Sequence, residues 1–211
     1  MKQNASHLED IKEIRKLMEK SSKFLSLSGL SGVSAGAFAL LGALAAFLYS
    51  RKNQINLSEY IQKSDLNLDD PVLTFLILLS AGTLILAILS GFYFSLKKAK
   101  QIQINFWNSA AIRMLSHLFI PIITGGLVML ILFFRNELYL IPALSLIFYG
   151  LGLINAGKFS GPDINFLGLI QIILGLSALV FPGNSLIFWT TGFGFLHVIY
   201  GIYLYLKYDR T

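Results

Sequence analysis

The sequence predicts an all-α, polytopic integral membrane protein with six transmembrane helices. The chain has 211 residues, of which 55% are hydrophobic and only 13% are charged, whereas about 25% of the residues in an average soluble domain are charged. Its mean hydropathy is +0.67. Six apolar runs approach the roughly 20 residues that a helix needs to cross a bilayer. The polar segments between these runs leave no room for a large soluble domain.

The first 26 residues are the only sizeable polar segment before the membrane, and they predict a cytoplasmic amphipathic helix with a short lead-in. Residues 6–9 have the Ser-x-x-Glu form of a capping box, which marks a helix start. Apolar residues then recur at helical spacing, while charged residues fill the opposite face. This apolar stripe is a candidate contact for lipid or for a protein partner, and it consists of Leu8, Ile11, Ile14 and Met18.

The transmembrane domain is expected to occupy residues 27–206, with a short tail at 207–211. Asp70-Pro71 marks the start of the second span, because a capping carboxylate followed by proline is typical of a helix N-terminus. Proline and glycine at residues 182–183 reverse the chain before the last span. The six spans are expected at about 27–50, 71–96, 114–134, 138–157, 164–181 and 186–206.

The distribution of basic residues predicts the orientation. One set of loops, together with both chain ends, contains thirteen Lys and Arg residues, and the other set contains four. Basic residues stay in the cytoplasm, so both termini are expected there. The net charge of +6 lies in loops and sets orientation, and we expect no direct contact with nucleic acid.

Few polar side chains lie deep in the expected spans, and each is a functional candidate because a polar group is costly in a bilayer. Gln171 and His197 are about equally far from the turn at 182–185, so two antiparallel helices bring them to one depth. They predict either the wall of a small polar cavity or plain interhelical hydrogen bonds, worth about 0.6 kcal/mol each. The other candidates for this cavity are Asn155, Thr83 and Thr124.

Small residues crowd the first span. Ser28, Gly32 and Gly36 are spaced four residues apart, a pattern that lets helices pack closely within one chain or between chains. Residues 29–32 (Gly-Leu-Ser-Gly) resemble the nucleophile motif of rhomboid intramembrane proteases, which have six core helices and a histidine on the last. In that family the serine lies on the fourth core helix, and its His-x-x-x-Asn pattern is missing here. Helix packing is the preferred interpretation.

No catalytic, metal or cofactor site is predicted. The chain contains no cysteine, which removes thiol chemistry and thiolate metal sites, and its three histidines are scattered. No charged residue lies inside an expected span, which argues against an ion-coupled pump.

The link between the second and third spans is basic and aromatic. Basic clusters next to a membrane attract anionic lipid headgroups, and an acidic protein surface is the alternative partner. The candidate contacts are Lys97, Lys98, Lys100, Trp107 and Arg113.

Residues 24–32 (Phe-Leu-Ser-Leu-Ser-Gly-Leu-Ser-Gly), preceded by the charged helix, resemble a family of small six-span bacterial inner-membrane proteins with no known activity. The resemblance implies a bacterial inner-membrane location. The first hypothesis is a non-enzymatic module that senses or tethers, with membrane lipids and a cytosolic protein or a second copy as partners. The second is a small carrier or channel for a neutral or apolar solute, and the third is an intramembrane serine hydrolase.

Overall fold

The computed structural model describes residues 28–63 and 69–209, and their regular structure is entirely helical. No strand occurs in these two ranges, so the predicted all-α class is confirmed for them. Six helical segments there are long and apolar enough to cross a membrane, as a multi-pass membrane protein requires. The predicted amphipathic helix lies outside the described residues, as do its candidate contacts Leu8, Ile11, Ile14 and Met18.

The six spans are five single helices and one composite helix. The single helices are α2 (Gly29–Asn53), α4 (Pro71–Gln101), α5 (Ser109–Phe134), α6 (Ile141–Ser160, entered through the 3-10 turn η1, Leu138–Leu140) and α7 (Pro162–Val180). The composite sixth span consists of η2 (Pro182–Asn184), α8 (Ser185–Trp189), the π-helix η3 (Thr190–Leu196), α9 (His197–Leu204) and the π-helix η4 (Tyr205–Asp209). A short helix that was not predicted, α3 (Leu57–Lys63), lies between α2 and α4.

Side-chain caps set the starts of three spans. Ser28 caps α2, Asp70 caps α4 and Asn108 caps α5, each by accepting a backbone N–H within 3.2 Å. Because Asn108 supplies a cap, α5 begins before the hydrophobic run that predicted it. Helix α4 likewise continues through its lysines to Gln101, where basic side chains interact favourably with the C-terminal end of the helix dipole.

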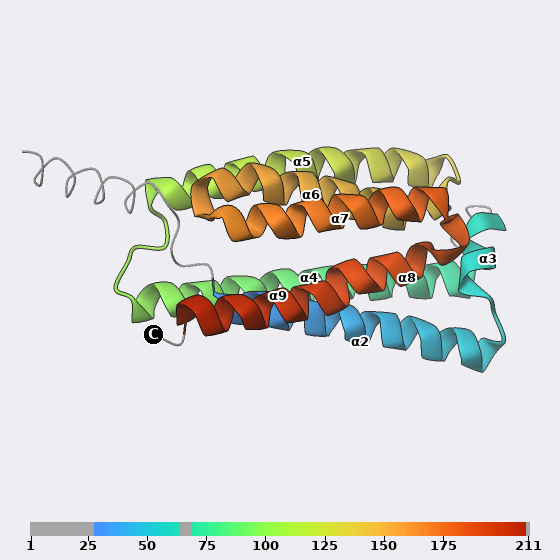
Figure 1. Cartoon of the computed structure of the whole chain (residues 1–211). Helices are drawn as coiled ribbons and strands as arrows, with labels where there is room; N and C mark the ends of the chain where they lie inside the picture. The colour runs from blue at the N-terminus through green and yellow to red at the C-terminus, as the bar shows by residue number, and fades with distance from the viewer. Residues whose placement is uncertain (1–27, 64–68, 210–211) are drawn as a thin grey trace, which may run out of the picture.

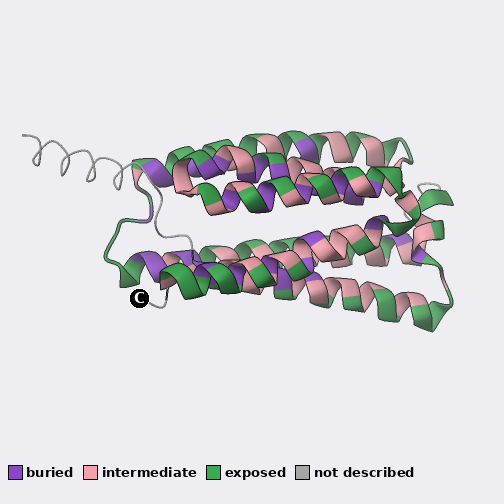
Figure 2. Ribbon diagram, viewed as in Figure 1, coloured by how far each residue is buried: buried purple, intermediate pink, exposed green. Residues whose placement is uncertain are grey.

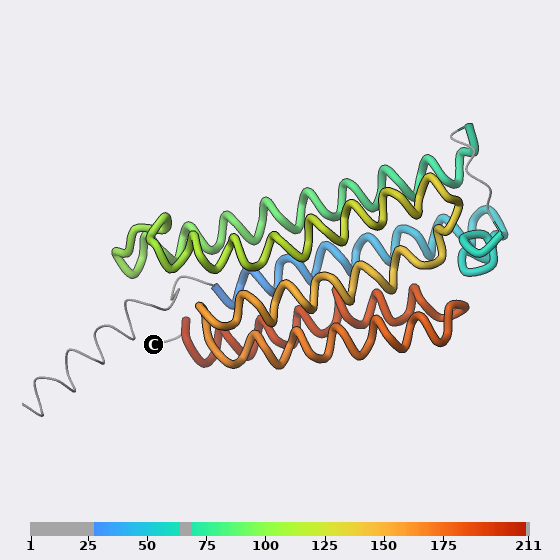
Figure 3. Tube along the Cα trace, turned by 90° about the horizontal axis from the view of Figure 1, so that it is seen from above, coloured from blue at the N-terminus to red at the C-terminus, as the bar shows by residue number. Residues whose placement is uncertain are grey.

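The long helices run side by side (Figures 1 and 3). They form two groups (Figure 1), and the sixth span contacts both. In one group α6 packs against α5 and α7, and in the other α2 packs against α4. The sixth span contacts α6 and α7 through α8, and it contacts α2 through η3 and α9. We call the end of the bundle that holds Ser28, the turn from α4 to α5 and Asp209 the Ser28 end, and the opposite end the Pro71 end.

Burial follows this arrangement. Buried residues lie where helices face one another, and exposed residues cover the outer sides (Figure 2). Many large aliphatic side chains of α4 and α5 are exposed, which suits contact with lipid tails.

Helix α3 covers the Pro71 end. It contacts both η1 and η2, which are the turns that lead into the fourth and sixth spans. The Tyr60 hydroxyl donates to the Asp70 carboxylate at 2.5 Å, which ties α3 to the start of α4. This hydrogen bond, together with the one from the Val72 N–H, lowers the pKa of Asp70 below its usual value.

Candidate functional site

Gln171 and His197 meet at the middle of the bundle through a shared backbone acceptor. Gln171 on α7 is fully buried, and its Nε2 donates to the Gly192 carbonyl oxygen at 2.8 Å. Nδ1 of His197 lies 2.8 Å from the same oxygen. Because a carbonyl oxygen only accepts, Nδ1 carries the proton. The 3.4 Å approach between Gln171 Nε2 and His197 Nδ1 therefore joins two donors and is a packing contact.

Tyr149 of α6 completes this network, although the sequence analysis did not select it. Its hydroxyl lies 2.9 Å from Nε2 of His197. A neutral imidazole that donates from Nδ1 accepts at Nε2, so the Tyr149 hydroxyl is the donor. The four residues Tyr149, Gln171, Gly192 and His197 thus join α6, α7 and the sixth span, and we call them the Gln171 network.

A π-helical turn brings Gly192 to this position. Residues 190–196 form the π-helix η3, and such turns occur frequently at functional sites. A Cβ atom on Gly192 would lie 2.5 Å from both Gln171 Oε1 and Leu146 Cδ2. Glycine is therefore required for Gln171 to reach the carbonyl.

The Gln171 network consists of neutral hydrogen-bonding groups. Its side chains are a phenol, a carboxamide and an imidazole, and none of the four residues is a carboxylate. Gln171 Oε1 is buried and has no hydrogen-bond partner among the described residues. A buried acceptor of this kind calls for an explanation such as an ordered water or a ligand.

The other three residues predicted for the polar cavity do not join the Gln171 network. Thr124 is exposed on α5 and donates to the Ile120 carbonyl of its own helix at 2.9 Å. Thr83 lies against α2, where a Cβ on Gly42 would meet its Oγ1 at 2.5 Å. Asn155 is half-buried on α6, about 9 Å along the helix axis from Tyr149.

The small residues of α2 pack against the sixth span of the same chain. A Cβ on Gly32 would lie 3.1 Å from the Gly201 Cα, and one on Gly36 would lie 2.8 Å from the Gly194 carbonyl oxygen. For these two glycines the close approach is therefore intramolecular. Ser28 does not extend this face, because it lies before the helix as its N-cap.

Two clusters of charged side chains join helices at the Ser28 end. Asp209 accepts from the Ser28 hydroxyl at 3.0 Å and from the Gly29 N–H at 2.9 Å. Its other oxygen lies 2.5 Å from Lys98 Nζ. Lys98, predicted to contact lipid or a partner, is 9% exposed and is paired within the chain, unlike its neighbours Lys97 and Lys100. In the second cluster, Asp163 accepts from Lys207 at 2.9 Å and from Tyr208 at 2.8 Å.

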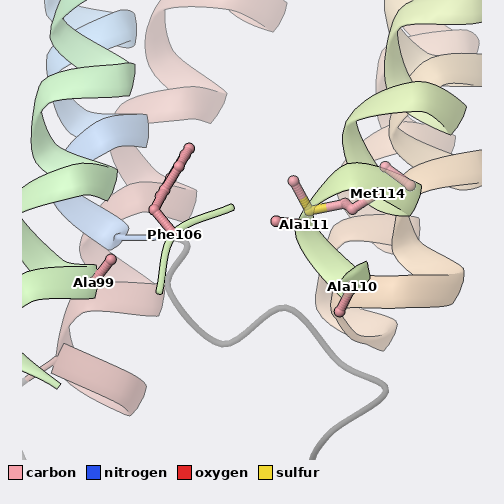
Figure 4. Packing of buried hydrophobic residues seen from close by; sticks show 6 residues of the cluster. Ala99, Phe106, Ala110, Ala111 and Met114 are labelled. Atoms are coloured by element: carbon pink, nitrogen blue, oxygen red, sulfur yellow. The ribbon is translucent and has the colours of Figure 1, made fainter. Parts of the chain in front are cut away.

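The turn from α4 to α5 exposes apolar side chains beyond the ends of both helices. Ile102 is 40%, Ile104 37% and Trp107 56% exposed. Phe106 is buried in a cluster with Ala99 of α4 and with the start of α5 (Figure 4), and it anchors the turn. We call Ile102, Ile104 and Trp107 the turn patch.

Exposed cations surround the turn patch. Lys97 and Lys100 are exposed on the last turns of α4. Arg113 is exposed on α5, with its guanidinium 6.0 Å from the centre of the Phe159 ring. The cluster of basic candidates thus separates into three exposed residues and the paired Lys98.

The serines of the rhomboid-like stretch bond to their own helix. Ser31 donates to the Ser28 carbonyl at 2.5 Å, and Ser34 donates to the Ser31 carbonyl at 3.0 Å. The described residues hold no group of three or more His, Cys, Asp or Glu residues that could bind a metal ion. No protein-family model matches the chain, and neither a curated protein nor a solved structure was found to match it.

Proposed function

We propose that this chain is a bacterial inner-membrane protein whose termini face the cytoplasm, and that it senses or tethers a cytosolic protein without catalysing a reaction. The excess of Lys and Arg on the Ser28 end of the chain supports the orientation. The resemblance of residues 24–32 to small bacterial inner-membrane proteins supports the location.

The turn patch is the observation that carries the proposal. Its three large apolar side chains are exposed at the Ser28 end, past the last residue of α4 and before the first residue of α5. An exposed apolar patch with a charged rim is typical of a protein interaction site. Phe106 fixes the turn to both helices, so the surface is formed before any partner arrives.

The interior supports a binding role over a catalytic one. In the Gln171 network, Gln171 and His197 donate to the Gly192 carbonyl and Tyr149 donates to His197. The Ser31 and Ser34 hydroxyls bond to backbone carbonyls. The N-terminal segment enters α2 at Ser28, on the same end of the bundle as the turn patch. The two regions together would form one cytoplasmic contact surface.

Site-specific photo-cross-linking tests the proposal. A benzophenone amino acid replaces Ile104 in the turn patch, and in a control it replaces Ile120, which is exposed in the middle of α5. We expect the probe at position 104 to cross-link a cytosolic protein in intact cells, and we expect deletion of residues 1–23 to weaken this product. The probe at position 120 should give no such product.

Three results would overturn the tether. They are the absence of a cytosolic product from position 104, the same product from position 120, and a product from position 104 that contains only lipid. A cross-linked product that contains two copies of this chain would indicate that the partner is a second copy and not a cytosolic protein.

A second candidate is a carrier or channel for a neutral solute, and the unpaired Gln171 Oε1 favours it. An acceptor at the middle of the bundle is where a neutral solute with a donor group would bind. The Gln171→Ala, His197→Ala double variant tests this function, with Thr124→Ala, which changes a hydroxyl bonded to its own helix, as the control. Unchanged uptake and binding of every tested solute in the double variant would exclude it.

A further inference from the structure

One face of α4 carries an ordered sequence of exposed side chains. Leu86, Leu89, Tyr93, Lys97 and Lys100 are all exposed. At 100° per residue they fall within an arc of about 80°. Two aliphatic residues are followed by an aromatic one and then by two lysines, which is the order that a lipid-facing helix presents from hydrocarbon to headgroup. We call these five residues the α4 stripe.

The spacing along α4 matches the thickness of the lipid layers. Lys97 lies about 6 Å beyond Tyr93 along the helix axis, and Lys100 lies about 10 Å beyond it. Each interfacial layer of a bilayer is about 5–7 Å thick. With the Tyr93 ring at the edge of the hydrocarbon, Lys97 lies within this layer. The backbone of Lys100 lies just outside the layer, and its long side chain points back toward the helix N-terminus and so toward the phosphates.

The charge of the α4 stripe selects its occupant. Helix α4 contains no Asp or Glu, and Asp209, a carboxylate that reaches α4 at this end of the described bundle, is paired with Lys98. Helix α4 packs chiefly on α2, and Tyr93 on the stripe remains 61% exposed. A second copy joined by a two-fold axis through this face would bring lysines against lysines, which is repulsive. A phosphodiester headgroup with a net negative charge is complementary to them.

We propose that the α4 stripe is a binding site for an anionic glycerophospholipid, with acyl chains along Leu86 and Leu89 and the phosphate between Lys97 and Lys100. The site selects anionic over zwitterionic lipid. This inference goes beyond the tether, because it assigns a lipid to Lys97 and Lys100 and needs no cytosolic protein.

Competition between two lipids measured by native mass spectrometry tests the site. The full-length protein in detergent is mixed with equal amounts of phosphatidylglycerol and phosphatidylcholine that have the same acyl chains. The variant is Lys97→Gln, Lys100→Gln, and the control is Lys52→Gln, Arg135→Gln, which removes two exposed cations at the Pro71 end. We expect the unmodified protein to retain phosphatidylglycerol preferentially, the variant to lose about tenfold or more of this preference, and the control to keep it.

Either of two results would overturn the lipid site. One is an unchanged preference in the Lys97→Gln, Lys100→Gln variant, and the other is an equal loss in the control. Because the purified protein is tested without any cytosolic protein, a negative result leaves the tether standing, and a failed cross-link leaves the lipid site standing.

Discussion

Replacing Gly192 with alanine should open the contact between α7 and the sixth span. The added Cβ would lie 2.5 Å from Gln171 Oε1 and 2.5 Å from Leu146 Cδ2. Gln171 and Leu146 are both fully buried, so neither side chain can swing into open space. The structure must therefore relax by moving Gln171 off the Gly192 carbonyl or by moving the helices apart.

The cost follows from two effects. Overpacking a well-filled interior by a methyl group costs about 1–3 kcal/mol, and losing the interhelical hydrogen bond of Gln171 adds about 0.6 kcal/mol. Because 1 kcal/mol shifts the Tm of a domain of 150–250 residues by about 2–4 °C, the Tm should fall by about 3–14 °C.

Thermal unfolding of the purified protein in detergent measures this change. Gly126→Ala is the matched control, because a Cβ at that glycine meets no atom within 4 Å. We expect Gly126→Ala to leave the Tm unchanged or to raise it slightly, since alanine is the better helix former. Equal Tm values for the two variants would refute the role given to the close approach at Gly192.

Three further predictions concern the ends of the bundle and the serines of α2. Asp209→Ala should destabilise the protein by about 3 kcal/mol, because it removes the carboxylate that is paired with the buried Lys98. Asp163→Ala, whose partner Lys207 is more exposed, should cost less in the same denaturation series. Tyr60→Phe removes the main cause of the lowered pKa of Asp70, so the stability difference from the unmodified protein should be fully present at pH 7. It should begin to shrink as the pH falls through the ordinary Asp pKa of 3.8, and it should be lost only below the lowered pKa that Asp70 has in the folded unmodified protein. A difference that stays constant as the pH falls through this range would contradict the assignment. A fluorophosphonate probe should label neither Ser31 nor Ser34, because both hydroxyls donate to carbonyls of their own helix, and labelling of either serine would support the hydrolase hypothesis.

Much of the helical organisation could be predicted from the sequence, because the apolar runs and capping residues are local signals. The equal distance of Gln171 and His197 from the turn at 182–185 also indicated that they share one depth. The form of their contact could not be predicted. A π-helical turn has no sequence signature comparable to a cap, and it is this turn that presents the Gly192 carbonyl to both side chains.

The sequence could not predict the surroundings of residues whose contacts lie far away along the chain. The contact of Ser28 with Asp209 spans 181 positions, and nothing near either residue indicates the other. Lys98 looked like its exposed neighbours Lys97 and Lys100, because only the folded chain brings Asp209 beside it. Thr124 was selected for its polarity, yet a threonine in a helix can satisfy its own hydroxyl on a preceding carbonyl. Tyr149 was not selected, because nothing near it in the sequence indicates that its hydroxyl meets a histidine 48 positions away.

The tether rests on one premise, which is that the Ser28 end of a six-span bundle faces the cytoplasm. Single-cysteine labelling tests it directly, since the chain contains no cysteine of its own. Ile104→Cys marks the Ser28 end, and Asn184→Cys marks the Pro71 end; both positions are exposed. With a membrane-impermeant maleimide on spheroplasts, we expect labelling of Asn184→Cys at once and of Ile104→Cys only after permeabilisation. Labelling of Ile104→Cys in intact spheroplasts would contradict the orientation and the tether with it.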